Sequence, residues 1–563
     1  MKTEQDLRAL LTRIDHRGYP AYKDLTGAYQ LGRFVLSIDH VQGDPFAAPS
    51  QLSVRLDAKE AAFPASLFRL PRQKRALEDT LTRRFGKLLE EVSFRVKGSG
   101  QSGRMGTCPC GPEIVERSSC HIDDKGNVVA RLEAGFPAAG RTIQARGLER
   151  MLLEFLPRCV TDALCYDQWD KKTLQAVADL AQDQEAIRTQ MAQQGLCAFV
   201  ADGSILPRAS GVSEQPMAGA VPFYAPESMA VKMTLPKGGV LRGMGIARGI
   251  TLICGGGYHG KSTLLQAIEK GVYDHIAGDG REYVLTDETA MKIRAEDGRS
   301  VYKTDISLFI HDLPSGKDTR NFTTKDASGS TSEAANVVEA MEAGSRLLLL
   351  DEDTSATNFL VRDALMQRVI CREMEPITPF LDRIEALYTQ FGVSVVLVAG
   401  SSGAFFHPAN HILQMDRYVP KDITAIAKKA AAAFPLQQTD LPSVKMPCFD
   451  RRPKAPALTG ERVKIKPLGM DSLALGRETL DLRAVEQIIS SEETAALGYC
   501  LRYAARHLMD GKRTVQQVVD ALEEVLNQQT VAALGEGRAV PFLVRPRRQE
   551  IFAAIDRYRE LTF

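Results

Sequence analysis

Near its middle the chain reads Gly255-Gly256-Gly257-Tyr258-His259-Gly260-Lys261-Ser262-Thr263. This stretch fits the phosphate-binding pattern G-x-x-x-x-G-K-[ST], and an apolar run at 249–254 and a helix-forming run at 262–269 supply the strand and helix that the pattern requires. In such a loop the backbone N–H groups surround the phosphates, Lys261 reaches the β and γ oxygens, and the Ser262 hydroxyl binds magnesium. The stretch therefore predicts a nucleoside triphosphate site, with all of its residues as candidate nucleotide contacts.

A second group of residues supplies the chemistry of hydrolysis. Four leucines at 347–350 predict a buried strand, and Asp351 and Glu352 follow at its carboxyl end, where open α/β sheets place their ligands. Acidic clusters that end a core strand are also common at protein surfaces, so the pairing with the phosphate loop carries the interpretation. Asp351 and Ser262 are the candidate magnesium ligands, and Glu352 is the candidate general base that polarises the attacking water. The expected cofactors are ATP and Mg²⁺.

A third motif precedes a predicted helix at 332–343. Ser328 and Gly329 form a turn whose N–H groups and hydroxyl present an anion site at the positive end of that helix. Most turns of this kind are ordinary helix caps, but this one lies between the other two motifs. It resembles the signature motif of ABC-class ATPases, in which the Ser-Gly turn of one subunit closes over the γ-phosphate held by the other. The resemblance implies that Ser328 and Gly329 act with Lys261 and Glu352 as catalytic residues across a homodimer interface.

The wider wording of the chain is similar to one family. Besides the phosphate loop, the residues that carry the similarity are Gly278-Asp279-Gly280-Arg281-Glu282, Arg294-Ala295-Glu296-Asp297-Gly298-Arg299, Ala327 to Ser332, Asp351-Glu352-Asp353-Thr354-Ser355-Ala356-Thr357-Asn358, and stretches at 39–47 and 199–208. They resemble the predicted soluble ABC-class ATPases, bacterial P-loop ATPases with protist relatives, over nearly the whole chain. The resemblance implies an ABC-type P-loop fold and ATP hydrolysis.

Two residues that ABC-class ATPases usually carry are missing. A predicted strand at 393–398 leads into residues 399–403, where transporter-type enzymes have a histidine that contacts the γ-phosphate; here a Ser401 or Ser402 hydroxyl is the candidate substitute. The glutamine that senses magnesium is also missing, and His311 and Asp312, after a strand-like run at 305–310, are the nearest candidates for its role. These departures predict slow turnover.

Composition sets the outer bounds. At 563 residues, with 44% hydrophobic and 25% charged residues, the chain can bury several cores. No stretch approaches eighteen consecutive apolar residues, and the N-terminus lacks an apolar signal region. The ten cysteines are scattered, which suits reduced thiols. We therefore expect a soluble cytoplasmic protein with no membrane span.

The pattern of elements predicts three domains. Residues 1–160 read as a mixed α/β domain, with strands at 28–38 and 127–134 and a helix at 76–91. Residues 161–437 read as the ATPase core, behind a helix at 171–194. A charged, proline-rich passage at 435–456 leads to residues 438–563, with helices at 482–509 and 514–527. The expected fold class is α/β: an ABC-type P-loop ATPase core flanked by an N-terminal α/β domain, possibly nucleic-acid-binding, and a mainly helical C-terminal domain.

Local clusters of positive charge predict the kind of partner. The net charge of +1 does not by itself indicate nucleic acid. Residues 69–104 are nevertheless rich in arginine and lysine, and the candidate nucleic-acid contacts there are Arg72, Lys74, Arg75, Arg83 and Arg84. The arginines at 545–559, around Phe552 and Tyr558, form a second cluster suited to phosphates and bases. Solvated helix faces with long side chains explain both patterns equally well.

Three classes of function are compatible with these motifs. The first is an ABC-class ATPase that hydrolyses ATP at a homodimer interface and binds or remodels nucleic acid, with RNA favoured. The second is an ATPase of protein assembly or of a membrane transporter, disfavoured for transport because the short interval between Lys261 and Ser328 leaves little helical surface for docking. The third is a small-molecule phosphotransferase, against which the signature-like turn argues.

Overall fold

The computed structural model describes residues 1–563 except 364, 366–368, 371–373, 436–443, 457, 459, 461–462, 538–539 and 541, so the expected passage at 435–456 lies partly outside the described residues. The chain forms two units, Met1–Gln182 with Gln529–Arg545, and Asp183–Gln528 with Pro546–Phe563. The division into domains at 1–160, 161–437 and 438–563 stays a prediction. Among the described residues, no helix combines the length and apolar character that crossing a bilayer requires.

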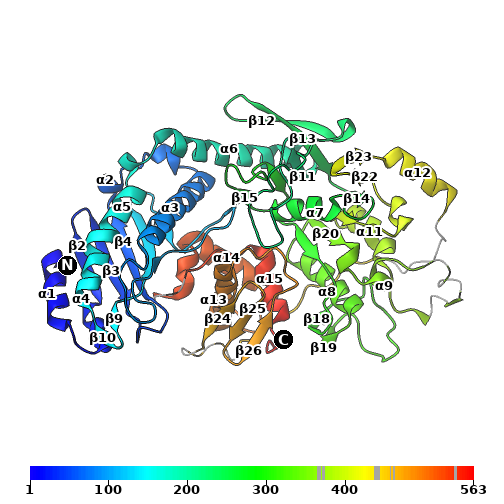
Figure 1. The fold of residues 1–563 in the computed structure, drawn as a ribbon. Helices are drawn as coiled ribbons and strands as arrows, with labels where there is room; N and C mark the ends of the chain where they lie inside the picture. Colours follow the sequence, from blue (N-terminus) through cyan, green and yellow to red (C-terminus); the bar gives the residue numbers. More distant parts are fainter. Residues whose placement is uncertain are drawn as a thin grey trace. The chain divides into compact units, whose positions relative to one another are not determined.

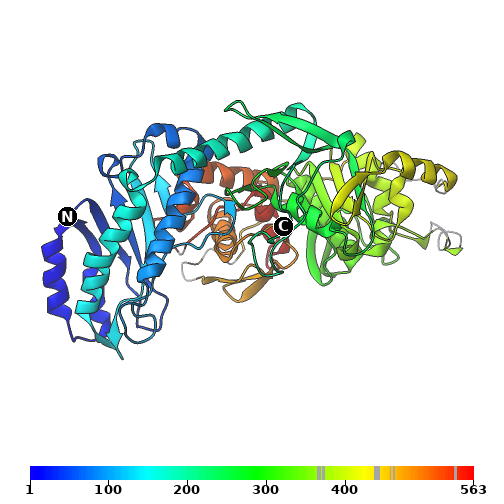
Figure 2. The ribbon, with the colours of Figure 1, turned by 45° about the horizontal axis from the view of Figure 1, so that its top comes forward.

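The first unit is built on a seven-stranded sheet (Figure 1). Its strands lie in the order β1 (Lys2–Thr3), β2 (Gly27–Leu31), β3 (Phe34–His40), β4 (Ser50–Leu56), β8 (Val128–Ala134) and β5 (Met105–Gly106), and β7 (Cys120–Ile122) also pairs with β8. Leu36, Val54 and Leu132 are buried on one face, beside α3 (Pro71–Val92) and α5 (Leu156–Leu164), which run side by side in both views (Figures 1 and 2). Because α3 and α5 lie on that face, the alternate side chains of β4 and β8 are polar except for Val129.

The expected single strand at 28–38 is wrong, because the chain reverses inside it. β2 and β3 form an antiparallel hairpin in which Leu31 pairs with Phe34, leaving Gly32 and Arg33 as the turn. Gly32 has φ 55°, the left-handed conformation that two-residue hairpin turns need. The alternation of buried residues continues through the turn, so periodicity alone does not reveal the reversal. The expected helix at 76–91 and strand at 127–134 are confirmed as α3 and β8.

The second unit holds a six-stranded sheet. Its order is β17 (Met291–Ile293), β20 (Leu347–Asp351), β21 (Ser394–Val398), β14 (Ile250–Cys254), β22 (His411–Asp416) and β23 (Val419–Asp422). Neighbouring strands are parallel except for the β22–β23 hairpin. The helices α7 (Lys261–Lys270), α8 (Gly329–Glu342) and α11 (Phe380–Thr389) pack against these strands. Covered parallel sheets need apolar side chains on both faces, which explains why all four leucines of β20 are buried.

Two smaller sheets complete this unit. An antiparallel sheet has the order β12 (Ala230–Thr234), β13 (Val240–Ala247), β11 (Leu196–Ala201) and β16 (Val284–Thr286), and Ile187 and Met191 of α6 (Lys171–Gln193) share its core. A three-stranded sheet of β24 (Ile465–Leu468), β25 (Ser472–Leu475) and β26 (Glu478–Asp481) packs on α13 (Ser491–His507). With α14 (Val515–Gln529) and α15 (Arg548–Arg557), this C-terminal region is mainly helical, as expected.

Two expected elements of this unit are corrected. The helix expected at 482–509 begins only at Ser491, because the Ser490 hydroxyl accepts the Glu493 N–H at 3.1 Å and caps α13. Residues 305–310 form a turn instead of a strand, since the Asp305 carboxylate accepts the Ser307 N–H at 3.1 Å. The strand there is β18 (Arg299–Thr304), which pairs with β19 (Phe322–Ala327).

Candidate functional site

The phosphate loop, residues 255–263, leaves β14 and enters α7, which is the strand–loop–helix order that its motif predicts. Gly255 has φ 132°, and a Cβ built on it would lie 2.5 Å from the Met415 carbonyl oxygen, so this position requires glycine. Gly260 has φ 95° and precedes Lys261, the first residue of α7. The first turn of a helix has no internal partners for its N–H groups, which makes it a natural phosphate site. Ser262 is exposed in that turn.

Lys261 lies across its own loop. Its Nζ donates to the carbonyl oxygens of Gly255 at 2.9 Å and Gly256 at 2.8 Å. A Cβ built on Gly400 would lie 3.8 Å from the same nitrogen. The loop that follows β21 is therefore the immediate neighbour of the lysine.

His259 anchors the phosphate loop to the turn of the β22–β23 hairpin. Its Nδ1 accepts the Arg417 N–H at 3.0 Å, and its carbonyl accepts the Tyr418 N–H at 3.2 Å. Both turn residues have positive φ, 48° and 72°. Tyr258, in contrast, is fully exposed. Sequence reasoning missed this support, because no local pattern links His259 to the turn between β22 and β23.

The strand order of the sheet brings Asp351 and Glu352 close to the phosphate loop. β21 separates β14 from β20, and parallel strands end at the same edge. A Glu352 carboxylate oxygen accepts the N–H groups of Gly400 at 2.7 Å and Ser401 at 2.8 Å. Because Gly400 also neighbours Lys261, Glu352 and Lys261 flank one loop. Asp351 is buried, and its carboxylate accepts the Asp353 N–H at 3.1 Å.

The candidate substitutes for the two missing residues lie in different surroundings. Ser401 and Ser402 lie in the loop after β21, beside Glu352 and Lys261; Ser401 is exposed, and the Ser402 hydroxyl accepts the Ala404 N–H at 3.4 Å. The His311 ring nitrogen Nε2 lies 2.9 Å from the Thr378 hydroxyl, and the other ring nitrogen faces Asp312 at 3.3 Å. The serines are thus the candidates that share a loop with the other site residues.

The signature-like turn lies apart from its own phosphate loop. Ser328 is the exposed residue before α8, and its hydroxyl lies 3.0 Å from the Thr331 hydroxyl. A Cβ built on Gly329 would have Asp297, Ala295 and Ala356 as its nearest neighbours. These neighbours come from the 294–299 stretch and from the segment after β20, not from residues 255–263. The turn therefore faces outward, where a second molecule can reach it.

Glu333 links the signature helix to the segment that follows Glu352. This side chain is buried, and one carboxylate oxygen accepts the Ala356 N–H at 2.8 Å. Burial raises its pKa to about 7, although the bonds from Ala356 and Ser355 act in the opposite direction. A carboxyl that titrates near neutral pH thus joins α8 to the end of β20.

Most of the arginines at 545–559 form ion pairs within their own unit. Arg557 pairs with Glu296, Nε to oxygen at 3.1 Å, and Arg547 pairs with Glu550 at the same distance. The expectation that Phe552 and Tyr558 stack bases is wrong, because both rings are buried. Arg559 is exposed and donates to the Gly298 carbonyl oxygen at 2.9 Å, at the rim of a cavity of about 510 Å³ lined also by residues 294–300.

The basic residues of α3 are not equivalent. Arg83 pairs with Asp79 at 2.6 Å, and the Arg84 guanidinium lies 4.2 Å from the centre of the Trp169 ring and donates to the Gln168 carbonyl oxygen at 3.0 Å. Lys74 is 4.0 Å from the exposed Asp124 carboxylate. Arg72 and Arg75 are partly exposed. Arg83 and Arg84 therefore serve the packing of the first unit, whereas Arg72, Lys74 and Arg75 are candidates for an external phosphate on the ground of their partial exposure.

Comparison with known proteins places this geometry in a family. A P-loop domain of the ABC ATPases matches residues 170–452, the N-terminal region of ATPases of the ABC class matches residues 4–167, and a domain described as MRB1590 C-terminal matches residues 464–563. The uncharacterized protein MJ1628 of Methanocaldococcus jannaschii is 34% identical over 192 residues, 32% of this chain and 43% of that protein. The chain thus matches less than half of the length of this relative.

Two solved structures of ABC transporter components are also similar, and neither carries a functional argument. CbiO1 of Clostridium perfringens, part of an ABC transporter complex, has 14% identity and a TM-score of 0.27 over 42% of this chain and 91% of its own. MJ1267, an ATP-binding cassette in its ADP conformation, has 10% identity and a TM-score of 0.26 over 42% and 95%. The P-loop match alone spans half of the chain, with the motifs of the site inside it. The chain therefore belongs to the ABC-class ATPases.

Proposed function

We propose that this protein hydrolyses ATP at sites that two copies of the chain build together. The observation that carries the proposal is the convergence of Lys261 and Glu352 on the loop after β21, at the edge where three parallel strands end. A phosphate-binding cation and a carboxylate beside the same loop are what phosphoryl transfer to water requires.

In this proposal residues 255–263 hold the phosphates, and Glu352 orients and deprotonates the attacking water. One Glu352 carboxylate oxygen accepts two backbone N–H groups, so the other oxygen would accept the proton of the attacking water. Ser262 and Asp351 are oxygen donors at the same edge of the sheet, which suits Mg²⁺. When bound, this ion offsets the charge on the β and γ phosphates.

The second half of each site comes from the partner copy. Ser328 and Gly329 are outward-facing and have neighbours other than their own phosphate loop. A two-fold pair places the same surface of each copy against the other, so each signature-like turn would complete the partner's site. ATP should therefore shift the Glu352→Gln variant towards a dimer in sedimentation, because it binds ATP without consuming it.

Steady release of ADP and phosphate tests the function itself. The wild-type protein should release both in equal amounts with Mg²⁺ and without an added acceptor, which a phosphotransferase would need. Lys261→Ala should lose this activity, whereas Lys429→Ala, which removes an exposed lysine of α12 (Thr424–Ala433), should keep it. Equal activity in Lys261→Ala would reject the site.

Nucleic acid, with RNA favoured over DNA, is the partner that we propose for this ATPase. The support is the partly exposed basic stretch of α3 at Arg72, Lys74 and Arg75. Phosphate contacts make such binding steeply salt-dependent, so replacing the three residues by glutamate should abolish it and leave basal ATPase unchanged. If neither RNA nor DNA binds at about 50 mM salt, with or without ATP, a protein partner is the better explanation.

A further inference from the structure

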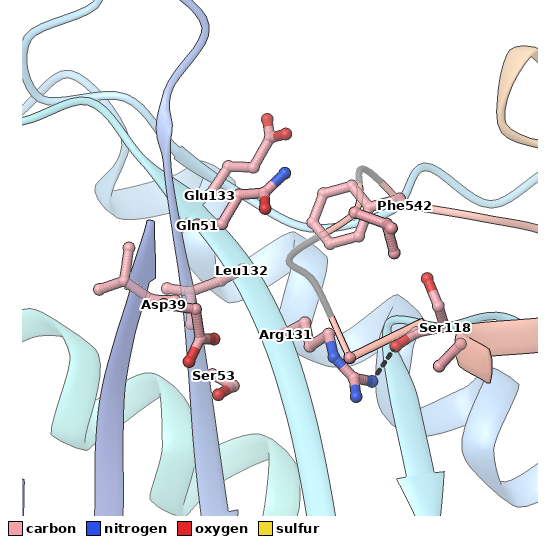
Figure 3. A pocket seen from close by; sticks show the side chains of 12 residues that line it. Asp39, Gln51, Ser53, Ser118, Arg131, Leu132, Glu133 and Phe542 are labelled. Carbon is pink, nitrogen blue, oxygen red and sulfur yellow. Dashed lines mark hydrogen bonds between the residues drawn. The ribbon is translucent and has the colours of Figure 1, made fainter. Parts of the chain in front are cut away.

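The first unit contains a cavity that the ATPase site does not use. It has a volume of about 430 Å³ and lies between the polar face of the seven-stranded sheet and the C-terminal strap, Gln529–Arg545 (Figure 3). Cavities that hold small ligands usually fall between 300 and 1,000 Å³. Its size therefore suits a small organic molecule.

The strap is attached by specific bonds to residues 116–118, which lie in the segment before β7. The Ser118 N–H donates to the Leu543 carbonyl at 2.9 Å, and the Leu543 N–H donates to the Ser118 hydroxyl at 2.9 Å. The Val531 N–H donates to the Glu116 carboxylate at 2.8 Å, and the Arg545 N–H donates to the Glu116 carbonyl at 2.9 Å. The strap is thus fixed near both of its ends, and the cavity lies between these attachments.

The register of the sheet builds the polar wall. Ser53 pairs with Arg131, so both side chains leave the same face, opposite to the buried Leu52 and Leu132. Asp39 lies at a register shift between β3 and β4, where a bulge redirects side chains. Figure 3 shows Asp39 and Ser53 on one side of Arg131, with Ser118 and Phe542 on the other.

Two opposite charges on this wall do not meet. The Arg131 guanidinium donates to the Ser118 carbonyl, and among the described residues neither Arg131 nor Asp39 forms an ion pair. Loss of hydration lowers the pKa of Arg131 against the attraction of Asp39, and it raises the pKa of Asp39 against the effects of the Ser53 hydroxyl and of Arg131. The two charges attract each other without forming an ion pair, and burial disfavours both charged forms, so a ligand that hydrogen-bonds to both would stabilise this fold.

The opposite wall is apolar and includes an aromatic ring. The described strap residues that line it are Ala532, Gly537, Val540 and Phe542. A ligand here therefore needs a flat apolar face for the strap and a polar edge for the sheet. That edge must offer acceptors to a guanidinium and donors to a carboxylate.

We propose that this cavity binds a guanine base, with its O6 and N7 acceptors towards Arg131, its N1–H and N2–H donors towards Asp39, and its face on Phe542. Arginine commonly binds the O6 and N7 pair of guanine. Adenine and cytosine each have one amino donor beside a ring nitrogen that is an acceptor. The Asp39 carboxylate could accept the amino N–H, but the ring nitrogen would repel its second oxygen. The base belongs either to a free nucleoside or nucleotide or to an unstacked residue of a single strand.

Calorimetric titration of the full chain with guanosine tests the proposal, and saturating ATP with Mg²⁺ separates this cavity from the phosphate loop. Guanosine should bind in the presence of ATP, and inosine, which lacks the N2 amine, should bind more weakly by about tenfold. Asp39→Asn should remove that preference, whereas Asp57→Asn, the same change at an exposed site outside the cavity, should retain it. Phe542→Ala should weaken binding on the order of tenfold or more, and Phe542→Tyr should restore it.

Short single strands with one guanine, or with adenine in its place, identify the source of the base. Binding of guanosine supports a free ligand, and guanine-dependent binding of the strand alone, abolished by Asp39→Asn, supports an unstacked residue of a single strand. Absence of both, or equal binding of guanosine and adenosine, overturns the proposal. Unfolding temperatures of the variants, measured alongside, separate loss of binding from loss of the fold.

Discussion

The phosphate loop and helix α3 both carry positive charges from which the sequence predicts an anionic ligand, and the structure uses these charges in opposite ways. Within the described part of the chain, Lys261 bonds only to backbone carbonyls of its own loop, contacts that a phosphate can replace. Arg83 and Arg84 are held by Asp79 and by the Trp169 ring. A motif with fixed spacing thus predicts where a charged side chain lies in the fold, whereas a count of charges along a helix does not show which of them are paired.

The largest expected effect is the loss of ATP hydrolysis when Glu352, beside the phosphate loop, is changed. Glu352→Gln keeps the size of the side chain and removes its basicity, so ATP hydrolysis should fall by roughly a hundredfold or more while ATP affinity is kept. Single-turnover hydrolysis and equilibrium nucleotide binding on the same protein measure the two quantities. Wild-type turnover would remove Glu352 from the role of general base.

A pH effect should follow from Glu333, which joins the signature helix to the same edge of the sheet. Its pKa of about 7 in the folded protein exceeds its ordinary value of 4.5, so the folded state binds the proton more tightly than the unfolded chain. The resulting stability is complete below about pH 4.5 and is lost as pH rises through 7, a change of about 3 kcal/mol at most. Denaturant unfolding of wild type and Glu333→Gln between pH 5 and 8 measures it, and parallel curves for the two proteins would contradict it.

The smallest expected effect is a difference in stability between two arginine variants of α3. Arg84→Ala removes a cation–π contact and a hydrogen bond, which should lower the stability of the first unit by about 1–2 kcal/mol. Arg75→Ala, at a partly exposed position of the same helix, should change stability by less than about 0.5 kcal/mol. Urea unfolding compares the two variants. Equal stabilities would mean that both arginines are solvated, as in the simplest interpretation of a charged helix.

The sequence predicts those parts of the fold whose signals are local. The glycines and lysine of the phosphate loop, the four leucines of β20 and the helices that follow both motifs are where their patterns place them. Fixed spacing leads to fixed geometry there, because a strand, a tight loop and a helix N-terminus are consecutive in the chain. Glu352 and Lys261 lie beside the same loop because of the strand order, which the sequence alone does not reveal.

Features made by distant residues could not be predicted in this way. The contact of His259 with Arg417 and the attachment of the strap to residues 116–118 join positions far apart in the chain. The hairpin at Gly32 was missed because its alternation runs on through the turn. Whether an arginine faces solvent or a buried aspartate likewise depends on which elements pack beside its helix.

Complementation between two inactive variants tests the central claim, that each ATP site joins the phosphate loop of one copy to the signature-like turn of another. Lys261→Ala removes the first half of a site and Ser328→Arg blocks the second, so each homodimer should be inactive. A mixed dimer contains one site in which both halves are intact. ATPase activity of mixed, exchanged subunits should therefore return to about half of the wild-type activity for each mixed dimer, and no recovery after verified subunit exchange would contradict the shared site.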